Sequence, residues 1–151
     1  QLIKTIQRLA FAISPQMLDD FGLHTTMGWL CNEFSILNNI PCVYEPGYDE
    51  KLLSHEMQVD FFRISQDALL YVLDHSEAGA IRIRMEDAVD SIRIRFIDSG
   101  AGFTTAHAKK EAGLLSIRER AASIHGVLRE PQAIGQGSEM QVLVRKQNSK
   151  N

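Results

Sequence analysis

The sequence predicts an α+β domain, a two-layer α/β sandwich in which helices cover one face of a mixed, mostly antiparallel sheet. Three observations support this prediction. Residues 54–76 carry apolar side chains at helical spacing, and residues 81–85 and 92–96 alternate apolar and charged side chains as half-buried strands do. The chain has 151 residues and 44% hydrophobic content, enough for one domain with a real core. Helices packed on one face of a sheet bury both apolar patterns.

The charge pattern argues against nucleic acid as a partner, and the hydropathy pattern argues against a membrane span. The net charge is −3, which offers no basic surface for nucleic acid. We interpret the strand arginines as a solvated sheet face rather than a phosphate track; they are Arg82, Arg84, Arg93 and Arg95. No run approaches the roughly 18 apolar residues of a membrane span, and no signal-peptide pattern occurs. We therefore expect a cytoplasmic location and no membrane contact by this fragment, while an anchor elsewhere in the parent protein stays open.

The two cysteines show no metal or redox spacing. Cys31 falls in a helical stretch and Cys42 in a strand-like stretch, without a C-x-x-C pattern. We expect two buried free thiols in a reducing compartment.

The beginning of the chain predicts two helices. Residues 1–13 form an amphipathic pattern whose apolar face would dock on a partner. Because this pattern starts at the first residue, we expect the chain to be a piece of a longer protein. Ser14 and Pro15 make a good cap and first turn for a second helix, which should pause at Gly22. A short strand over residues 40–44 and a turn over 46–49 follow.

The central motif is Asp98-Ser99-Gly100-Ala101-Gly102, which ends the alternating run of residues 91–97. The glycines permit positive φ and let a flat ligand approach the main chain. The Asp98 carboxylate is placed to accept a hydrogen bond from an exocyclic amine. A glycine-rich turn after a strand is, on its own, most often structural, so its neighbours decide the interpretation.

Two further glycine motifs follow. Residues 104–112 have little periodicity, and a helix should then begin at Gly113-Leu114 and end at His125-Gly126. The remaining strands, residues 127–129 and 140–144, close the sheet, with Gly135, Gly137 and Ser138 before the last strand.

This order of helix, hairpin, Asp-x-Gly-x-Gly, Gly-Leu helix and Gly-x-Gly strand resembles the ATP-binding catalytic domain of two-component sensor histidine kinases. The segment Met17-Leu18-Asp19-Asp20-Phe21-Gly22-Leu23 looks like the linker of the subgroup that includes the nitrate sensors. The resemblance implies three parts. They are the end of a dimerisation and phosphoacceptor hairpin (1–13), the ATPase domain (14–146) and a disordered tail (147–151).

The resemblance also implies a nucleotide site. Adenine would lie against Asp98, and the triphosphate would lie near the start of the Gly113 helix, where free N–H groups and the helix dipole favour anions. Residues 104–112 resemble a mobile lid, in which Lys109 and Lys110 either contact phosphate or are solvated. The residues expected to bind nucleotide are His75, Asp98, Gly100, Gly102, Gly113, Leu114, Gly135, Gly137 and Ser138.

The long helix departs from the family pattern Q-E-A-L-x-N-x-x-K-H, in which the Asn holds Mg²⁺ and the Lys meets phosphate. Here Asp67 shortens the Glu, Tyr71 replaces the Asn and Asp74 replaces the Lys. A phenol is a poor Mg²⁺ ligand, and a carboxylate repels phosphate. Both ATP and Mg²⁺ are therefore expected cofactors whose binding is weakened or lost, and the metal ligands are unknown.

Three interpretations of Asp67 remain open. As implied by the resemblance, it is the catalytic acid/base or water-orienting residue. Alternatively, it pairs with Arg63 one turn away while Tyr71 packs over an empty cleft. In a third version, Asp67 or Asp74 supplies the missing metal ligand.

The expected function is transfer of the ATP γ-phosphoryl group to a histidine on an upstream hairpin of a homodimer, which passes it to a response regulator. None of the five histidines lies in residues 1–13 or in the family's phosphoacceptor context, so that histidine should lie upstream. The alternative is a degenerate, non-catalytic module that serves as a dimerisation or docking scaffold for a response regulator or partner kinase. An anti-sigma-factor-like serine kinase is disfavoured by the linker resemblance of residues 15–23.

Overall fold

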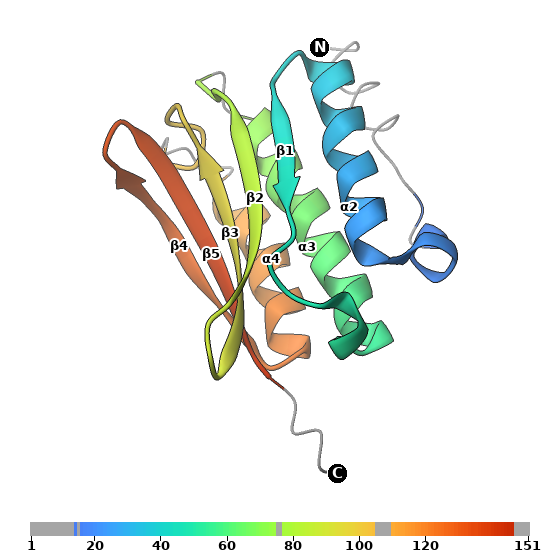
Figure 1. Cartoon of the computed structure of the whole chain (residues 1–151). Coiled ribbons are helices and arrows are strands. Elements are labelled where there is room, and N and C mark those ends of the chain that lie inside the picture. Colours follow the sequence, from blue (N-terminus) through green and yellow to red (C-terminus); the bar gives the residue numbers. More distant parts are fainter. Residues whose placement is uncertain (1–13, 15, 75–76, 105–109, 147–151) are drawn as a thin grey trace.

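Helices and strands form separate layers. The computed structural model describes residues 14, 16–74, 77–104 and 110–146. Within them, three helices, α2 (Gln16–Asn38), α3 (His55–Leu73) and α4 (Lys110–Ser123), lie on one face of the sheet (Figure 1). A 3-10 turn, η1 (Glu50–Leu52), precedes α3. The predicted two-layer α+β class is confirmed. The predicted helix over residues 1–13 and the tail over 147–151 lie outside the described residues.

The sheet is mixed and mostly antiparallel, as expected. Its order is β1-β2-β3-β5-β4, and only β1 and β2 pair in parallel. The strands are β1 (Cys42–Glu45), β2 (Ile81–Asp87), β3 (Ser91–Asp98), β4 (Gly126–Ile134) and β5 (Gly137–Arg145). This order places β3 at the centre of the sheet and β4 at its edge.

The core lies between the sheet and the helices. The apolar residues of the β2–β3 hairpin face the helices, and Ile83 lies opposite Phe96 with both side chains fully buried. From the helical layer, Phe34, Phe61 and Phe62 are also fully buried. The arginines between the apolar positions face the other side of the sheet, which no described helix covers (Figure 1). The solvated sheet face is therefore where the alternation predicts it.

Helix α2 is two helical segments joined at a glycine. The Gln16 N–H donates to Ser14 Oγ at 3.1 Å, so Ser14 serves the helix start as predicted. Gly22 has φ 83° and ψ 168°, and this break is the predicted pause. After the break, the His24 N–H donates to Glu50 Oε1 at 2.8 Å, so a distant carboxylate caps the second segment.

The last helix differs from the prediction at its start. It begins at Lys110, so Gly113 lies at the end of its first turn rather than at its start. The helix ends at Ser123, just before the predicted stop at His125-Gly126, and His125 has a left-handed φ of 62°. Gly126 is needed because a Cβ there would lie 2.8 Å from Val144 Cγ2.

The two thiols are buried and free, as expected. A hydrogen bond with Cys31, together with burial, raises the pKa of the Cys42 thiol well above its usual range. Among the described helices, none combines the length and the apolar character that crossing a membrane requires.

Candidate functional site

The Asp98 carboxylate is the centre of a ring of backbone N–H groups. Asp98 is the last residue of β3, between Ile81 of β2 and Ser138 of β5, and its side chain is fully buried. Its Oδ1 accepts hydrogen bonds from the N–H groups of Gly79 at 2.7 Å and Gly100 at 3.2 Å, and its Oδ2 accepts from Gly102 at 2.5 Å. A buried carboxylate is tolerated only with such partners.

The two motif glycines serve close packing. Neither Gly100 nor Gly102 has a left-handed φ, so the expected use of positive φ is wrong. Instead, a Cβ on Gly100 would overlap the carbonyl oxygen of Glu77, and a Cβ on Gly102 would overlap Asp98 Oδ2. The chain therefore wraps around its own carboxylate, and glycine is required at both positions.

The start of β5 completes this end of the sheet. A Cβ on Gly137 would overlap the Asp98 carbonyl oxygen, so the two strands approach closely there. The Phe103 N–H donates to Ser138 Oγ at 3.1 Å, and both side chains are fully buried. Gly137 and Ser138 thus lie beside Asp98, and their contact with nucleotide stays a prediction. Gly135 instead forms the exposed β4–β5 turn with φ 55°.

Tyr71 of α3 contacts the loop that follows β3. Its ring stacks on Phe103 with centroids 6.1 Å apart and planes 8° apart, and the Tyr71 side chain is only 3% exposed. On α4, a Cβ at Gly113 would lie 2.9 Å from Tyr71 Cδ1, so this glycine makes room for the ring. Leu114, the next residue, is buried in the core. The residue that replaces the family's Asn is thus an aromatic ring packed between Phe103 and Gly113.

Asp67 joins α3 to α4. Its Oδ2 accepts hydrogen bonds from Ser116 Oγ at 2.8 Å and Arg120 Nε at 3.1 Å. The partner is therefore Arg120 of α4 rather than Arg63 of the same helix. Asp67 and Tyr71 are one turn apart, so the face of α3 that carries them contacts α4. A role for Asp67 as acid/base stays a prediction.

The remaining expected residues lie at the end of α3 and in the loop before α4. Asp74 is the exposed C-terminal cap of α3. His75 lies outside the described residues, as does most of the predicted lid, residues 105–109. Lys109 lies in this segment, and Lys110 is the first residue of α4.

Sequence reasoning missed the contacts that cross between elements. Gly79 reaches Asp98 only because β2 pairs with β3, and Ser116 and Arg120 reach Asp67 only because α4 packs on α3. A glycine two residues before a strand was visible in the sequence, but nothing there linked it to a carboxylate on the next strand.

Curated relatives cover most of this chain. It is 29% identical over 139 residues to the signal transduction histidine-protein kinase/phosphatase DegS of Bacillus subtilis, and 29% over 140 residues to the sensor histidine kinase LiaS of that species. It is 23% identical over 126 residues to the nitrate/nitrite sensor protein NarX of Escherichia coli. These alignments cover 86%, 92% and 83% of this chain but only 36%, 38% and 21% of the relatives. The chain thus spans less than two fifths of each relative.

Solved structures share the layer arrangement. The blue-light activated histidine kinase EL346 of Erythrobacter litoralis matches 82% of this chain and 45% of its own, with a TM-score of 0.65 and 13% identity. The catalytic domain of histidine kinase ThkA matches 82% of this chain and 90% of its own, with a TM-score of 0.56 and 18% identity. This chain has the fold of a histidine kinase catalytic domain. The resemblance to sensor histidine kinases, nitrate sensors included, is therefore confirmed. No protein-family model matches the chain.

Proposed function

We propose that this chain is the ATP-binding catalytic domain of a sensor histidine kinase, which transfers the ATP γ-phosphoryl group to a histidine on an upstream helical hairpin. The observation that carries the proposal is the Asp98 carboxylate, held by three backbone N–H groups at the end of β3 on a histidine-kinase fold. The names of the relatives, sensor histidine kinases, support the same chemistry.

The donor set around Asp98 fits an adenine amine. An ionised carboxylate has about four lone-pair positions, and Gly79, Gly100 and Gly102 occupy three of them. One acceptor position is left for an exocyclic amine. Because the Asp98 side chain is fully buried, nucleotide binding requires the turn of residues 99–102 to move aside.

The triphosphate would lie toward the start of α4. The first turn of a helix presents N–H groups without intrahelical partners, and the helix dipole favours an anion there. In this chain that turn runs from Lys110 to Gly113. The bound triphosphate would supply the phosphoryl group, and the chain's own contribution would be to hold and orient it.

The residues that replace the family's metal-binding side chains do not fit Mg²⁺. Tyr71 presents a bulky ring packed between Phe103 and Gly113, and Asp67 already accepts bonds from Ser116 and Arg120. Mg²⁺ needs compact oxygen ligands in octahedral geometry. No group of three or more potential metal-binding side chains occurs among the residues that the structure describes. We therefore propose nucleotide binding with little assistance from Mg²⁺.

Partners follow from the same proposal. The parent protein would form a homodimer through its upstream helices and act in the cytoplasm on a response regulator. The phosphoacceptor histidine would come from the upstream hairpin of that dimer.

A second candidate function is favoured by the Tyr71 packing. In that function the chain is a non-catalytic module that keeps the fold as a docking or dimerisation scaffold. The Tyr71–Phe103 stack joins α3 to the loop after β3, and the Asp67–Arg120 ion pair joins α3 to α4. Both contacts strengthen packing at the expense of polar groups that could meet phosphate.

Isothermal titration with ATP, ADP and a non-hydrolysable analogue, each with and without Mg²⁺, separates the two functions. The catalytic proposal predicts measurable ATP binding that weakens when the 99–102 turn is altered. No heat at millimolar nucleotide would favour the scaffold. A double variant, Tyr71→Asn with Asp74→Lys, should restore metal-assisted binding. If it does not, these two substitutions are not the reason that the site is weak.

A further inference from the structure

We propose that the uncovered face of the sheet binds an acidic segment of a partner protein, in which an apolar side chain lies between two carboxylates. The site is a groove of about 470 Å³ at the β4 end of the sheet. It is lined by Ser91, His125, Val127, Arg129, Leu143 and Arg145. The proposal goes beyond the nucleotide function and does not depend on it.

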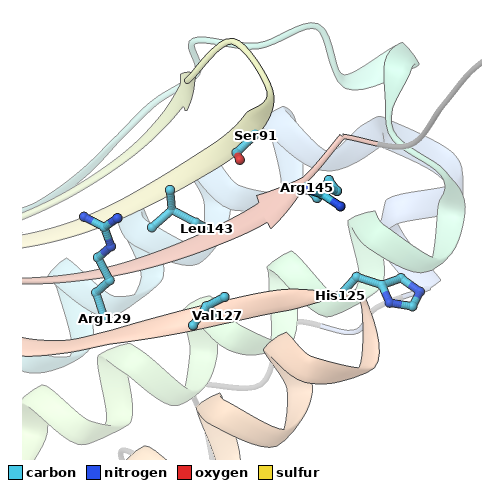
Figure 2. Close-up of a pocket in the computed structure, with 6 residues that line it drawn as sticks. All are labelled: Ser91, His125, Val127, Arg129, Leu143 and Arg145. Atoms are coloured by element: carbon cyan, nitrogen blue, oxygen red, sulfur yellow. The ribbon is translucent and has the colours of Figure 1, made fainter.

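The groove has an apolar floor with basic ends. Val127 and Leu143 lie opposite each other on β4 and β5, and Val127 is 64% exposed. Arg129 lies at one end of this pair, and Arg145 lies with His125 at the other end (Figure 2). An apolar floor between cations fits a ligand that carries both an apolar group and negative charge.

Charge separates the groove from the rest of the face. Elsewhere on the sheet the arginines are neutralised by carboxylates: Arg82 and Arg84 by Glu45, Arg93 by Glu86, and Arg95 by Glu86 and Glu139. In contrast, Arg129 and Arg145 have no ion pair with any residue in the described part of the chain. Two cations thus remain available in a protein whose net charge is −3.

The charge of the groove indicates the charge of its occupant. Neither Arg129 nor Arg145 is paired with a carboxylate within the part of the chain that the structure describes. Charge complementarity therefore favours an acidic occupant, and we assign this role to an extended segment of a partner protein.

The edge of the sheet disfavours binding by strand addition. Strand β4 is the edge strand, but its register shifts between Arg129 and Gln132, and Pro131 within that bulge has no N–H to donate. The partner would therefore lie on the face of the sheet and be held by side chains rather than by ladder hydrogen bonds.

The strand register sets the spacing of the ligand. Ser91 and Arg145 form one row across the sheet, Leu143 and Val127 the next row, and Arg129 lies in the third row with Gln141. Successive rows on one face lie two residues apart, so the outer rows are separated by about 13 Å. In an extended ligand this distance separates residues four apart. The expected pattern is therefore Asp/Glu-x-apolar-x-Asp/Glu.

The backbone supports a binding role for the His125 end. His125 holds a left-handed φ of 62°, which costs energy in a non-glycine residue. Glycine at this position would relieve that cost, but it would remove the imidazole from the groove.

The test is NMR titration of the isotope-labelled chain with an end-blocked peptide that has a Glu-Ser-Leu-Ser-Glu core. We expect amide shifts centred on Val127, Leu143 and Arg145. The double variant Arg129→Gln with Arg145→Gln should weaken the peptide about tenfold, since two charge contacts are lost. The matched control, Lys51→Gln with Arg82→Gln, changes net charge equally and should keep affinity within about twofold, while added salt weakens binding.

Three results would overturn the proposal. The first is equal binding of peptides with Lys in place of Glu or Ser in place of Leu, or no binding of any peptide. The second is binding of inorganic phosphate, an oligonucleotide or anionic vesicles at these residues without binding of the acidic peptide. The third is self-association that the double arginine variant abolishes, which would assign the face to a second copy of this chain. Circular dichroism of each variant checks that loss of binding is not loss of fold.

Discussion

At the scale of single residues, Asp98 stabilises the fold in addition to its proposed role in binding nucleotide. Its two oxygens hold three backbone N–H groups from two separate segments, and its side chain has no solvent exposure. A ligand contact at Asp98 can therefore be tested by mutation only if the cost to folding is measured as well.

We predict that Asp98→Asn lowers the free energy of unfolding by about 2 kcal/mol, since one amide NH₂ must face a backbone N–H donor. Ser99→Ala is the matched control, because the exposed Ser99 hydroxyl accepts the Ala80 N–H at 2.8 Å. It should cost less than about 1 kcal/mol. Urea denaturation measures both changes, and an unchanged midpoint for Asp98→Asn would show that the hydrogen-bond ring does not contribute to stability.

At His125 a substitution is predicted to increase stability rather than to decrease it. Because it holds a left-handed φ of 62°, His125→Gly should raise the free energy of unfolding by about 1 kcal/mol. At the next residue, Gly126→Ala should lower it, since the new Cβ would lie 2.8 Å from Val144 Cγ2. Thermal melting of the two variants checks these signs, and a stability loss in His125→Gly would refute the strain argument.

At the scale of elements, the sequence patterns that succeeded are those in which one periodicity decides burial. The alternation of the β2–β3 hairpin predicts which side chains face the core, and Gly22 predicts the break in α2. The start of α4 could not be predicted from Gly113, because this glycine is required by the Tyr71 ring on another helix. Local sequence shows the periodicity and the capping residues of a helix. It does not show which residue of another element packs against a given glycine.

The break in α2 yields an element-scale prediction with an internal control. At Gly22, φ is 83° and a Cβ would lie 2.9 Å from Glu50 Oε2, so Gly22→Ala should cost more than about 1 kcal/mol. Gly28 lies in the same helix, and apart from its own stretch of helix a Cβ added there would meet no atom of the described residues within 4 Å. Gly28→Ala should therefore stabilise the chain by about 0.5–1 kcal/mol. Equal changes in the urea midpoints of the two variants would contradict the assignment of a helix break at Gly22.

At the scale of the whole molecule, the uncovered sheet face carries a network of ion pairs that links three strands. Glu139 of β5 is 4% exposed and meets Arg95 of β3 at 2.7 Å, and Arg95 also meets Glu86 of β2 at 3.2 Å. Burial alone would raise the pKa of each glutamate. Hydrogen bonds outweigh this effect of burial and lower both pKa values. Glu139 accepts from Arg95 and Gln141, and Glu86 accepts from Arg93 and Arg95. Both carboxyl groups therefore have pKa values below the ordinary range.

This network predicts acid sensitivity. A carboxyl group whose folded-state pKa is depressed stabilises the fold above its unfolded pKa, near 4.3, and that stabilisation is lost as pH falls through the folded value. Stability should thus decline below about pH 4.5. Glu139→Gln should cost about 2 kcal/mol at neutral pH and make the decline shallower. Urea midpoints measured from neutral to acid pH test this, and an unchanged slope would exclude Glu139 as a contributor.

The candidate site shows where sequence alone stops. The Asp-x-Gly-x-Gly motif and the Tyr71 replacement were visible as residues, and the structure brings Asp98, Gly137 and Ser138 together. The sequence could not show that Tyr71 would stack on Phe103, because that contact joins α3 to a loop that lies beyond the whole β2–β3 hairpin in the chain. Long-range packing of this kind decides whether the site is open to nucleotide.

Isothermal titration of the unmodified chain with ATP, with and without Mg²⁺, shows whether this domain binds nucleotide. We predict measurable ATP affinity that Mg²⁺ changes by less than about threefold, because Tyr71 offers no compact oxygen ligand to the metal. The absence of heat at millimolar ATP would contradict it, and the histidine-kinase fold would then have to be explained by its contacts with partners.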